Sequence, residues 1–177
     1  MGVAATRSTG LVIVLMYAGI ISDILDGIIA RKLETSGRVF RIMDTVVDLV
    51  FYLSIVFFIS RTNWPALWEN YLLVYVIFTL EFLMYTVSLI RFRQLPSPHA
   101  LLSKLWGLVL VFEFTLLLLG VQGIHFQVAL MFGVVVHVDR LLIYCLLRTW
   151  DHDIPSVYHA YLVSQGKHIR RWKLFNG

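Results

Sequence analysis

The sequence predicts an all-α integral membrane protein, an antiparallel bundle of about five transmembrane helices. Of its 177 residues, 59% are hydrophobic and only 15% are charged. The mean hydropathy of +0.78 lies well above that of a soluble domain of this size. Five apolar runs are each long enough to cross a hydrocarbon core of about 30 Å. These runs lie at about residues 10–31, 42–60, 71–90, 101–120 and 126–147.

Short turns separate the runs, which makes neighbouring helices antiparallel. Residues 63–68, with a proline and two tryptophans, predict an interfacial turn after the second run. Pro96 and Pro98 predict a turn after the third run, and Gly120 and Gly123 close the hairpin between the fourth and fifth. The runs therefore predict one compact helical domain, to which we assign residues 1–148.

The distribution of positive charge predicts the topology. If the first run starts outside, twelve of the 15 Lys and Arg residues lie on one side, which the positive-inside rule makes cytoplasmic. These are Arg31, Lys32, Arg38, Arg41, Arg91, Arg93, Lys104, Arg148, Lys167, Arg170, Arg171 and Lys173. We expect the inner membrane of a bacterium as the location. Topology and anionic lipid, rather than nucleic acid, then explain the net charge of +4.

After Arg148 the composition becomes polar, and we interpret residues 149–177 as a cytoplasmic basic tail. Pro155 and Ser156 predict the start of a short helix that ends near Val163. The tail is expected to lie on the inner leaflet. A specific site for a lipid headgroup is the alternative.

Four aspartates stand out against this apolar background. Asp23 and Asp26 lie near the end of the first run, and Asp44 and Asp48 near the start of the second, each pair at helical spacing. An unpaired carboxylate in lipid costs roughly 2.5 to 3.5 kcal/mol even on scales from membrane-insertion experiments, which give the lowest values. The four aspartates therefore need a shared partner. Carboxylate oxygens suit Mg²⁺ or Mn²⁺. We therefore interpret the four aspartates as candidate ligands of a two-metal site.

The helix face that carries the first aspartate pair also carries Gly27, Ala30 and Arg31, within an arc of about 140°. The two small residues allow close approach, and Arg31 can bind a phosphate bidentately. Two divalent ions about 3.5 to 4 Å apart can clamp a pyrophosphate, so this set of residues indicates phosphoryl transfer. The alternative is that the aspartates are helix-end charges that face cytoplasmic water.

In this arrangement the chain resembles the CDP-alcohol phosphotransferase family, also called CDP-alcohol phosphatidyltransferases. The family signature is Asp-x2-Asp-Gly-x2-Ala-Arg-x8-Gly-x3-Asp-x3-Asp. The matching residues are Asp23, Asp26, Gly27, Ala30, Arg31, Asp44 and Asp48. The resemblance implies a dimeric membrane enzyme that transfers a substituted phosphoryl group from a CDP-linked donor to an alcohol and releases CMP. We expect CDP-diacylglycerol as the donor and a small polar alcohol as the acceptor, in phospholipid biosynthesis.

The resemblance also implies roles for individual residues. Asp23, Asp26 and Asp44 bind the divalent metal, and Asp48 is the general base. A base beside the metal can remain ionised within reach of the acceptor hydroxyl, because the metal neutralises its neighbours. The Gly-x2-Ala-Arg stretch at 27–31, together with Asp23, accommodates the nucleotide.

Two cations at the cytoplasmic ends of later runs are candidate phosphate contacts. Lys104 occupies the place of a lysine that the family has at the start of a later span, and it is our first choice. Arg91 ends the preceding run. The alternative is that both are membrane anchors whose charged ends reach water.

The chain departs from the family at two places. The second glycine of the signature is replaced by Phe40, which shares a helix face with Asp44, so that a bulky ring narrows the nucleotide slot. The family usually has six spans, one of them before the first aspartate helix, and this chain begins too late to include it. A degenerate or truncated homologue that acts as a membrane scaffold therefore stays open. A divalent-cation transporter that uses the same aspartates is a further alternative.

Other charged residues lie within the later runs. Glu81 and Glu113 fall near the middle of their runs, where a functional role is the default hypothesis and a neutral, hydrogen-bonded Glu is the alternative. Asp139 and Arg140, close to His137, point about 100° apart on one helix. Each is therefore expected to need a partner on another helix, and we predict structural roles for both.

Overall fold

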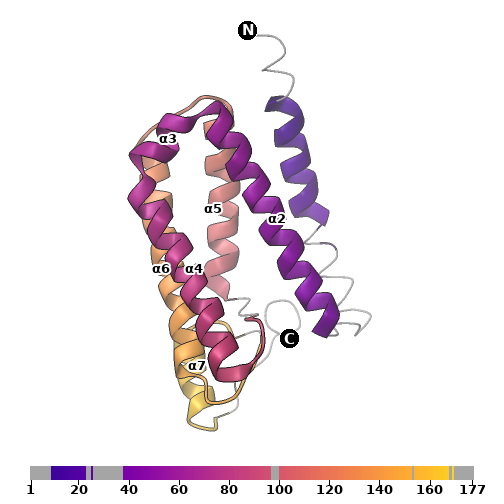
Figure 1. Cartoon of the computed structure of the whole chain (residues 1–177), viewed down its shortest axis with the longest axis vertical. Helices are drawn as coiled ribbons and strands as arrows, with labels where there is room; N and C mark the ends of the chain where they lie inside the picture. Colours follow the sequence, from indigo (N-terminus) through magenta and orange to yellow (C-terminus); the bar gives the residue numbers. More distant parts are fainter. Residues whose placement is uncertain are drawn as a thin grey trace. The chain divides into compact units, whose positions relative to one another are not determined.

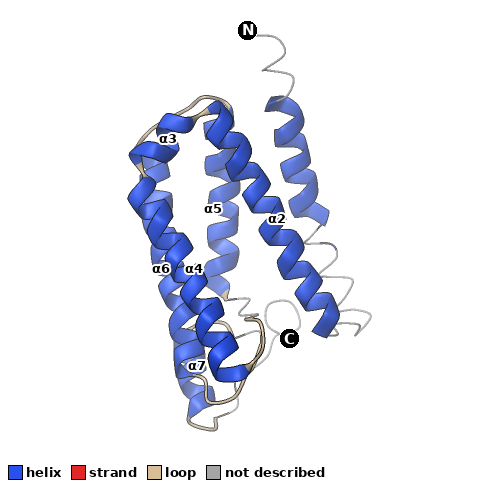
Figure 2. Cartoon of the chain, in the orientation of Figure 1, coloured by secondary structure: helices blue, strands red, loops and turns tan. Residues whose placement is uncertain are grey.

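The computed structural model describes residues 9–22, 25, 38–96, 100–152, 154–167 and 169. Every regular element in these ranges is a helix, as Figure 1 and Figure 2 show. The helices are Thr9–Ser22, α2 (Arg38–Thr62), α3 (Trp64–Glu69), α4 (Tyr71–Phe92), α5 (Leu101–Leu118), α6 (Ile124–Leu146) and α7 (Val157–Ser164). Side chains of α2 are described at residues 43, 46 and 47 and from residue 49 onward. The predicted all-α class is confirmed.

Three helices of the described part are long and apolar enough to cross a membrane, namely α4, α5 and α6. They coincide with the third, fourth and fifth predicted runs. The first and second runs contain the shorter apolar helices Thr9–Ser22 and Leu49–Thr62. The latter is the C-terminal part of α2, whose N-terminal part carries two arginines and two aspartates. These charges shorten the apolar stretch but do not interrupt the helix.

Several helices begin or end beside proline, glycine or serine residues, which are typical of helix ends. Pro65 is the second residue of α3, where the missing N–H of proline needs no partner. Gly120 has a φ of 80°, a conformation that glycine adopts without steric cost and that lets the chain leave α5. Ser156 precedes α7, so the predicted short helix after residue 155 is confirmed.

Contacts divide the chain into two compact units. Unit 1 comprises Met1–Glu69 and Leu110–His125, and unit 2 comprises Asn70–Val109 and Phe126–Gly177. The predicted division into a domain of residues 1–148 and a tail of residues 149–177 stays a prediction.

A buried amide connects two turns within unit 1. Asn63, between α2 and α3, is only 5% exposed. Its Nδ2 donates to the carbonyl of Leu117 at 3.2 Å, and its Oδ1 accepts from the amide of Gln122. Leu117 belongs to the last turn of α5, and its carbonyl also accepts from the N–H of Gly120 at 3.1 Å. Asn63 therefore adds a second hydrogen bond to this helix end and connects it to the predicted interfacial turn.

The core of unit 2 is formed where α4 and α6 meet the segments that follow them. Its buried members are Met84, Ala100, Ile143, Tyr144, Leu147, Ile154 and Ala160. Backbone contacts support it, because the N–H of Leu101 donates to the carbonyl of Pro155 at 3.1 Å, and Nε1 of Trp150 donates to the carbonyl of Leu95 at 3.1 Å. The chain after α6 thus packs against the turn between α4 and α5.

Asn63→Ala is expected to lower the free energy of unfolding by about 1 to 3 kcal/mol, because it removes both hydrogen bonds that connect the two turns. Thermal unfolding of the purified protein in detergent measures the loss. Gln127→Ala removes an exposed amide of α6 and serves as the control that should unfold like the wild type. An Asn63→Ala protein as stable as this control would contradict the assigned role.

Candidate functional site

The predicted metal and nucleotide site falls mostly outside the described residues. Asp23, Asp26 and the stretch 27–31 lie outside them, and Asp44 and Asp48 lie in α2 at positions whose side chains are not described. Among the residues that the structure does describe, no group of three or more His, Cys, Asp or Glu could hold a metal ion. The four-aspartate site therefore stays a prediction.

The helices that lead into this site are described, and they pack closely within unit 1. A Cβ placed on Gly19 would lie 2.6 Å from Cε2 of the Phe51 ring, so the absence of a side chain at residue 19 is needed for the contact. The helix Thr9–Ser22 runs antiparallel to α2 at this point (Figure 1). Gly19 lies four residues before Asp23, and Phe51 lies three residues after Asp48. The helix that precedes Asp23 in the sequence and α2 are thus held together close in sequence to the predicted ligands.

Lys104 lies in the first turns of α5, in unit 2. Its side chain is exposed, and its backbone N–H donates to the carbonyl of Ala100 at 3.3 Å. Ala100 is fully buried in the core described above. The backbone that carries Lys104 is therefore anchored, whereas its side chain is exposed.

Arg91, the second predicted phosphate contact, lies against the C-terminal end of α6. Its NH1 donates to the carbonyls of Tyr144 at 2.6 Å and Cys145 at 2.5 Å, and its NH2 donates to that of Leu147 at 2.9 Å. These bonds occupy three of the five N–H donors of a guanidinium. Carbonyls in the last turn of a helix have no partner within it, and a cation there also complements the helix dipole. Arg91 therefore caps α6 and connects it to α4.

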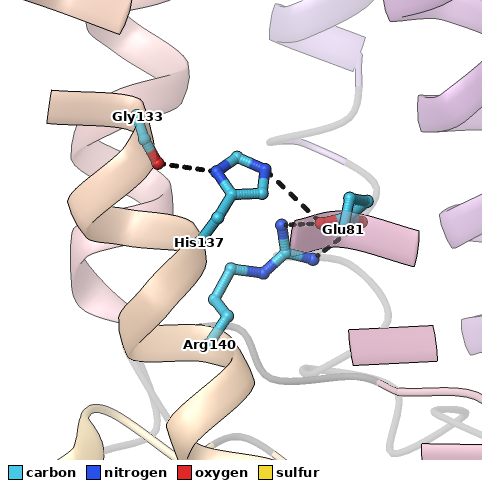
Figure 3. A network of polar contacts seen from close by, with 4 residues as sticks. All are labelled: Glu81, Gly133, His137 and Arg140. Atoms are coloured by element: carbon cyan, nitrogen blue, oxygen red, sulfur yellow. Dashed lines mark hydrogen bonds and ion pairs between the residues drawn. The ribbon is translucent and has the colours of Figure 1, made fainter. Parts of the chain in front are cut away.

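A network of charged side chains joins α4 to α6 inside unit 2 (Figure 3). Arg140 donates from NH1 to Oε2 of Glu81 at 2.7 Å and from NH2 to Oε1 at 3.2 Å. The Nδ1 of His137 lies 2.7 Å from the carbonyl of Gly133, and its Nε2 lies 3.4 Å from Oε2 of Glu81. The side chains are 23% exposed for Glu81, 16% for Arg140 and 5% for His137. The expectation that Arg140 needs a partner on another helix is confirmed.

Asp139 has a different partner from its neighbour. Its Oδ1 accepts from the backbone N–H of Val157 at 3.2 Å, and Val157 is the first residue of α7. The N–H of Val157 has no partner within α7, and the carboxylate of Asp139 supplies one. The carboxylate also lies at the positive end of the α7 dipole. The partner that we expected for Asp139 on another helix is thus the N-terminal end of α7. The contact fixes where α7 begins.

Glu113 pairs with a residue that sequence reasoning missed. The carboxyl group is almost fully buried, and its Oε2 lies 2.7 Å from Nδ1 of His125. A Cβ on Gly123 would lie 2.8 Å from the same imidazole ring, so glycine leaves room for it. The signal available in the sequence was a histidine two residues after Gly123, at the end of the hairpin.

The Glu81–Arg140 ion pair is expected to be strongly coupled. Either Glu81→Leu or Arg140→Leu should lower the free energy of unfolding by about 2 to 4 kcal/mol, because each leaves a largely buried charge without its partner. The double variant should lose less than the two single variants added together. Thermal unfolding in detergent measures all three, with the exposed Glu69→Leu as control. Additive losses would show that the pair does not act as a unit.

Comparison with known proteins confirms the family resemblance that the aspartate motif indicated. A family model described as CDP-alcohol phosphatidyltransferase matches residues 2–138, a stretch that contains all four aspartates, Glu81, Arg91 and Lys104. No curated protein and no solved structure matches the chain. Together with the apolar helices α4, α5 and α6, the family match identifies an integral membrane protein. The chain belongs to the CDP-alcohol phosphatidyltransferase family.

Proposed function

We propose that this protein transfers a phosphatidyl group from CDP-diacylglycerol to a small polar alcohol and releases CMP. Membership of the family indicates phospholipid head-group transfer by a transferase of substituted phosphate groups. The observation that carries the proposal is the motif itself. Seven residues from Asp23 to Asp48 have the identity and spacing of the family signature, and all lie within the matched stretch.

The packing of the helix Thr9–Ser22 against α2 supports a shared site. Gly19 and Phe51 define the register of this antiparallel pair. In the sequence, Asp26 follows Gly19 by seven residues and Asp44 precedes Phe51 by seven, while Asp23 follows Gly19 by four and Asp48 precedes Phe51 by three. An antiparallel pair that continued in this register would bring the two aspartate pairs to the same level. We infer that the two aspartate pairs face each other, as a shared metal site requires.

The residues fit divalent metal by the chemistry of their donors. Four carboxylates supply hard oxygen ligands of the kind that Mg²⁺ and Mn²⁺ prefer. We propose that Asp23, Asp26 and Asp44 hold the ions and that Asp48 completes the set. When bound, two such ions would stabilise negative charge on the phosphoryl oxygens and on the leaving group.

The residues of the chain then have distinct roles in the reaction. Asp48 accepts the proton of the alcohol hydroxyl, and the resulting alkoxide oxygen forms a bond to the phosphorus that carries diacylglycerol. The bond between this phosphorus and the oxygen it shares with CMP breaks, and CMP leaves with the bonding electrons. Gly27, Ala30 and Arg31, with Asp23, bind the nucleotide and hold it in line for the attack.

Lys104 is our proposed contact for a donor or acceptor phosphate. An exposed ammonium group in the first turns of α5 suits an anion, since the N-terminal end of a helix also favours negative charge. Arg91 is a weaker candidate, because three of its donors contact the end of α6.

We further propose a cytoplasmic site, a location in the inner membrane of a bacterium and a homodimer. The positive-inside distribution of Lys and Arg supports the topology, and the family resemblance supports the dimer. A catalytically degenerate scaffold is the second candidate, favoured by Phe40 in place of the signature glycine. A divalent-cation transporter is a third, although the aspartates cluster towards one end of their runs rather than at mid-span.

The proposal is tested by CMP release from CDP-diacylglycerol in detergent, with Mg²⁺ or Mn²⁺ and a panel of small alcohols. The wild type is expected to release CMP only when both metal and one particular alcohol are present. Asp48→Asn should abolish turnover and leave nucleotide binding nearly unchanged, because it removes the base but keeps the volume of the side chain. Asp151→Asn, outside the motif, is the matched control and should retain activity.

Each other outcome points to one alternative. Retained turnover in Asp48→Asn would disprove the role of Asp48 as base. Nucleotide binding without CMP release by the wild type would favour the scaffold. Metal flux into vesicles without any nucleotide would favour the transporter.

Phe40→Gly restores the signature residue and tests whether the ring narrows the nucleotide slot. We expect the KM for CDP-diacylglycerol to fall, with a smaller change in kcat, because the ring would act mainly on binding. Phe57→Gly, at an exposed position of the same helix, controls for the effect of a glycine on α2. A KM that rises equally in both variants would show that Phe40 does not obstruct the site.

A further inference from the structure

Lys104 and Trp106 project from opposite sides of α5. They are two residues apart, so their side chains point about 200° apart around the helix axis. Lys104 is exposed, whereas Trp106 is half-buried. The contacts that hold Trp106 therefore also determine the side of α5 on which the ammonium group of Lys104 emerges.

A row of residues on α6 holds Trp106. Its Nε1 donates to the carbonyl of Ala129 at 3.3 Å. Its ring meets the ring of His137 edge to face, with centroids 4.8 Å apart and planes at 90°. A Cβ on Gly133 would lie 2.7 Å from Cε2 and Nε1 of the indole. Residues 129, 133 and 137 are each four apart and form one ridge of α6, across which the indole lies.

The ridge is itself fixed from α4. The Nδ1 of His137 lies 2.7 Å from the carbonyl of Gly133, and its Nε2 faces Oε2 of Glu81 at 3.4 Å. That same oxygen accepts from Arg140. Figure 3 shows the imidazole between the Gly133 carbonyl and the Glu81 carboxylate. The orientation of His137 is thus set at both ring nitrogens, and its ring in turn orients Trp106.

We propose that Trp106, seated on the Ala129, Gly133 and His137 ridge, is a positioning residue that sets the rotation of α5 and thereby the direction of Lys104. The inference rests on the proposed function, in which Lys104 contacts a phosphate. A side chain at position 133 would displace the indole, because its Cβ would lie 2.7 Å from two ring atoms, and α5 would have to rotate or move away. The ammonium group would move with it.

The direction of residue 104 can be measured without any enzyme assay. Cys145 is the only cysteine of the chain, so Cys145→Ser provides a background in which Lys104→Cys is labelled alone. Adding Gly133→Ala should change the rate of maleimide labelling in vesicles several-fold. Gly10→Ala is the matched control, because a Cβ there meets no atom within 4 Å. Equal rates in the two alanine variants would overturn the proposal.

The kinetic test compares Gly133→Ala and Lys104→Gln in CMP release. Each is expected to raise the KM for CDP-diacylglycerol several-fold with a smaller change in kcat. The double variant should be no worse than Lys104→Gln alone, because a displaced Lys104 and an absent one lose the same contact. Trp106→Phe, which keeps a ring but loses the N–H donor, should give a smaller increase and serves where Gly133→Ala does not fold. Additive effects would overturn the proposal, since a general loss of packing adds to the loss of Lys104.

Failure of the proposed function is distinguishable from failure of this inference. If the wild type releases no CMP with any alcohol, the proposed function fails, and the labelling rates alone decide whether the ridge sets the direction of residue 104. If labelling changes but the KM does not, Trp106 orients α5 without serving the donor, and its role as a positioning residue is overturned.

Discussion

Every polar group inside the apolar helices must find its partner within the protein, because hydrocarbon offers none. In unit 2 the bidentate contact of Arg140 with Glu81 meets this requirement for two charges at once. It also fixes the faces that α4 and α6 present to each other. The position of His137, and with it the seat of the Trp106 indole, follows from that contact. This ion pair therefore joins α4 to α6 directly, and Glu81 also faces His137, whose ring contacts Trp106 of α5.

The two groups of charge in this chain have different electrostatic requirements. The Glu81–Arg140 pair is neutral in itself, so no further ion is needed to balance its charge. The aspartate motif combines four carboxylates with the single guanidinium of Arg31 and keeps three negative charges. The other residues of the signature do not balance these charges, and divalent cations are the proposed way to do so. In the proposed function, this difference separates charges that hold the helices together from charges that perform chemistry.

Sequence patterns predicted the helices well but not their contacts. Apolar runs gave α4, α5 and α6, and the change in composition after Arg148 gave α7, because both depend on local residue types. Helical geometry also predicted that Arg140 needs a partner on another helix. It could not identify Glu81, 59 residues away, because spacing shows which residues share a face and not which faces meet. For the same reason Trp106 and His125 were missed, and the facing of the two aspartate pairs remains a prediction.

Arg91 and Lys104 show how helix electrostatics helps to assign cations in a membrane protein. The side chain of Arg91, from α4, contacts the C-terminal end of α6. Carbonyls without helical partners and the negative end of the helix dipole are sufficient to explain a cation there. Lys104 lies in the first turns of α5, where the dipole is positive and a second positive charge is unfavourable. The contacts of Arg91 therefore explain its charge without a ligand, whereas the dipole of α5 gives Lys104 no comparable role. The proposed contact of Lys104 with a phosphate of a CDP-linked lipid would place an anion at the end of the helix that favours one.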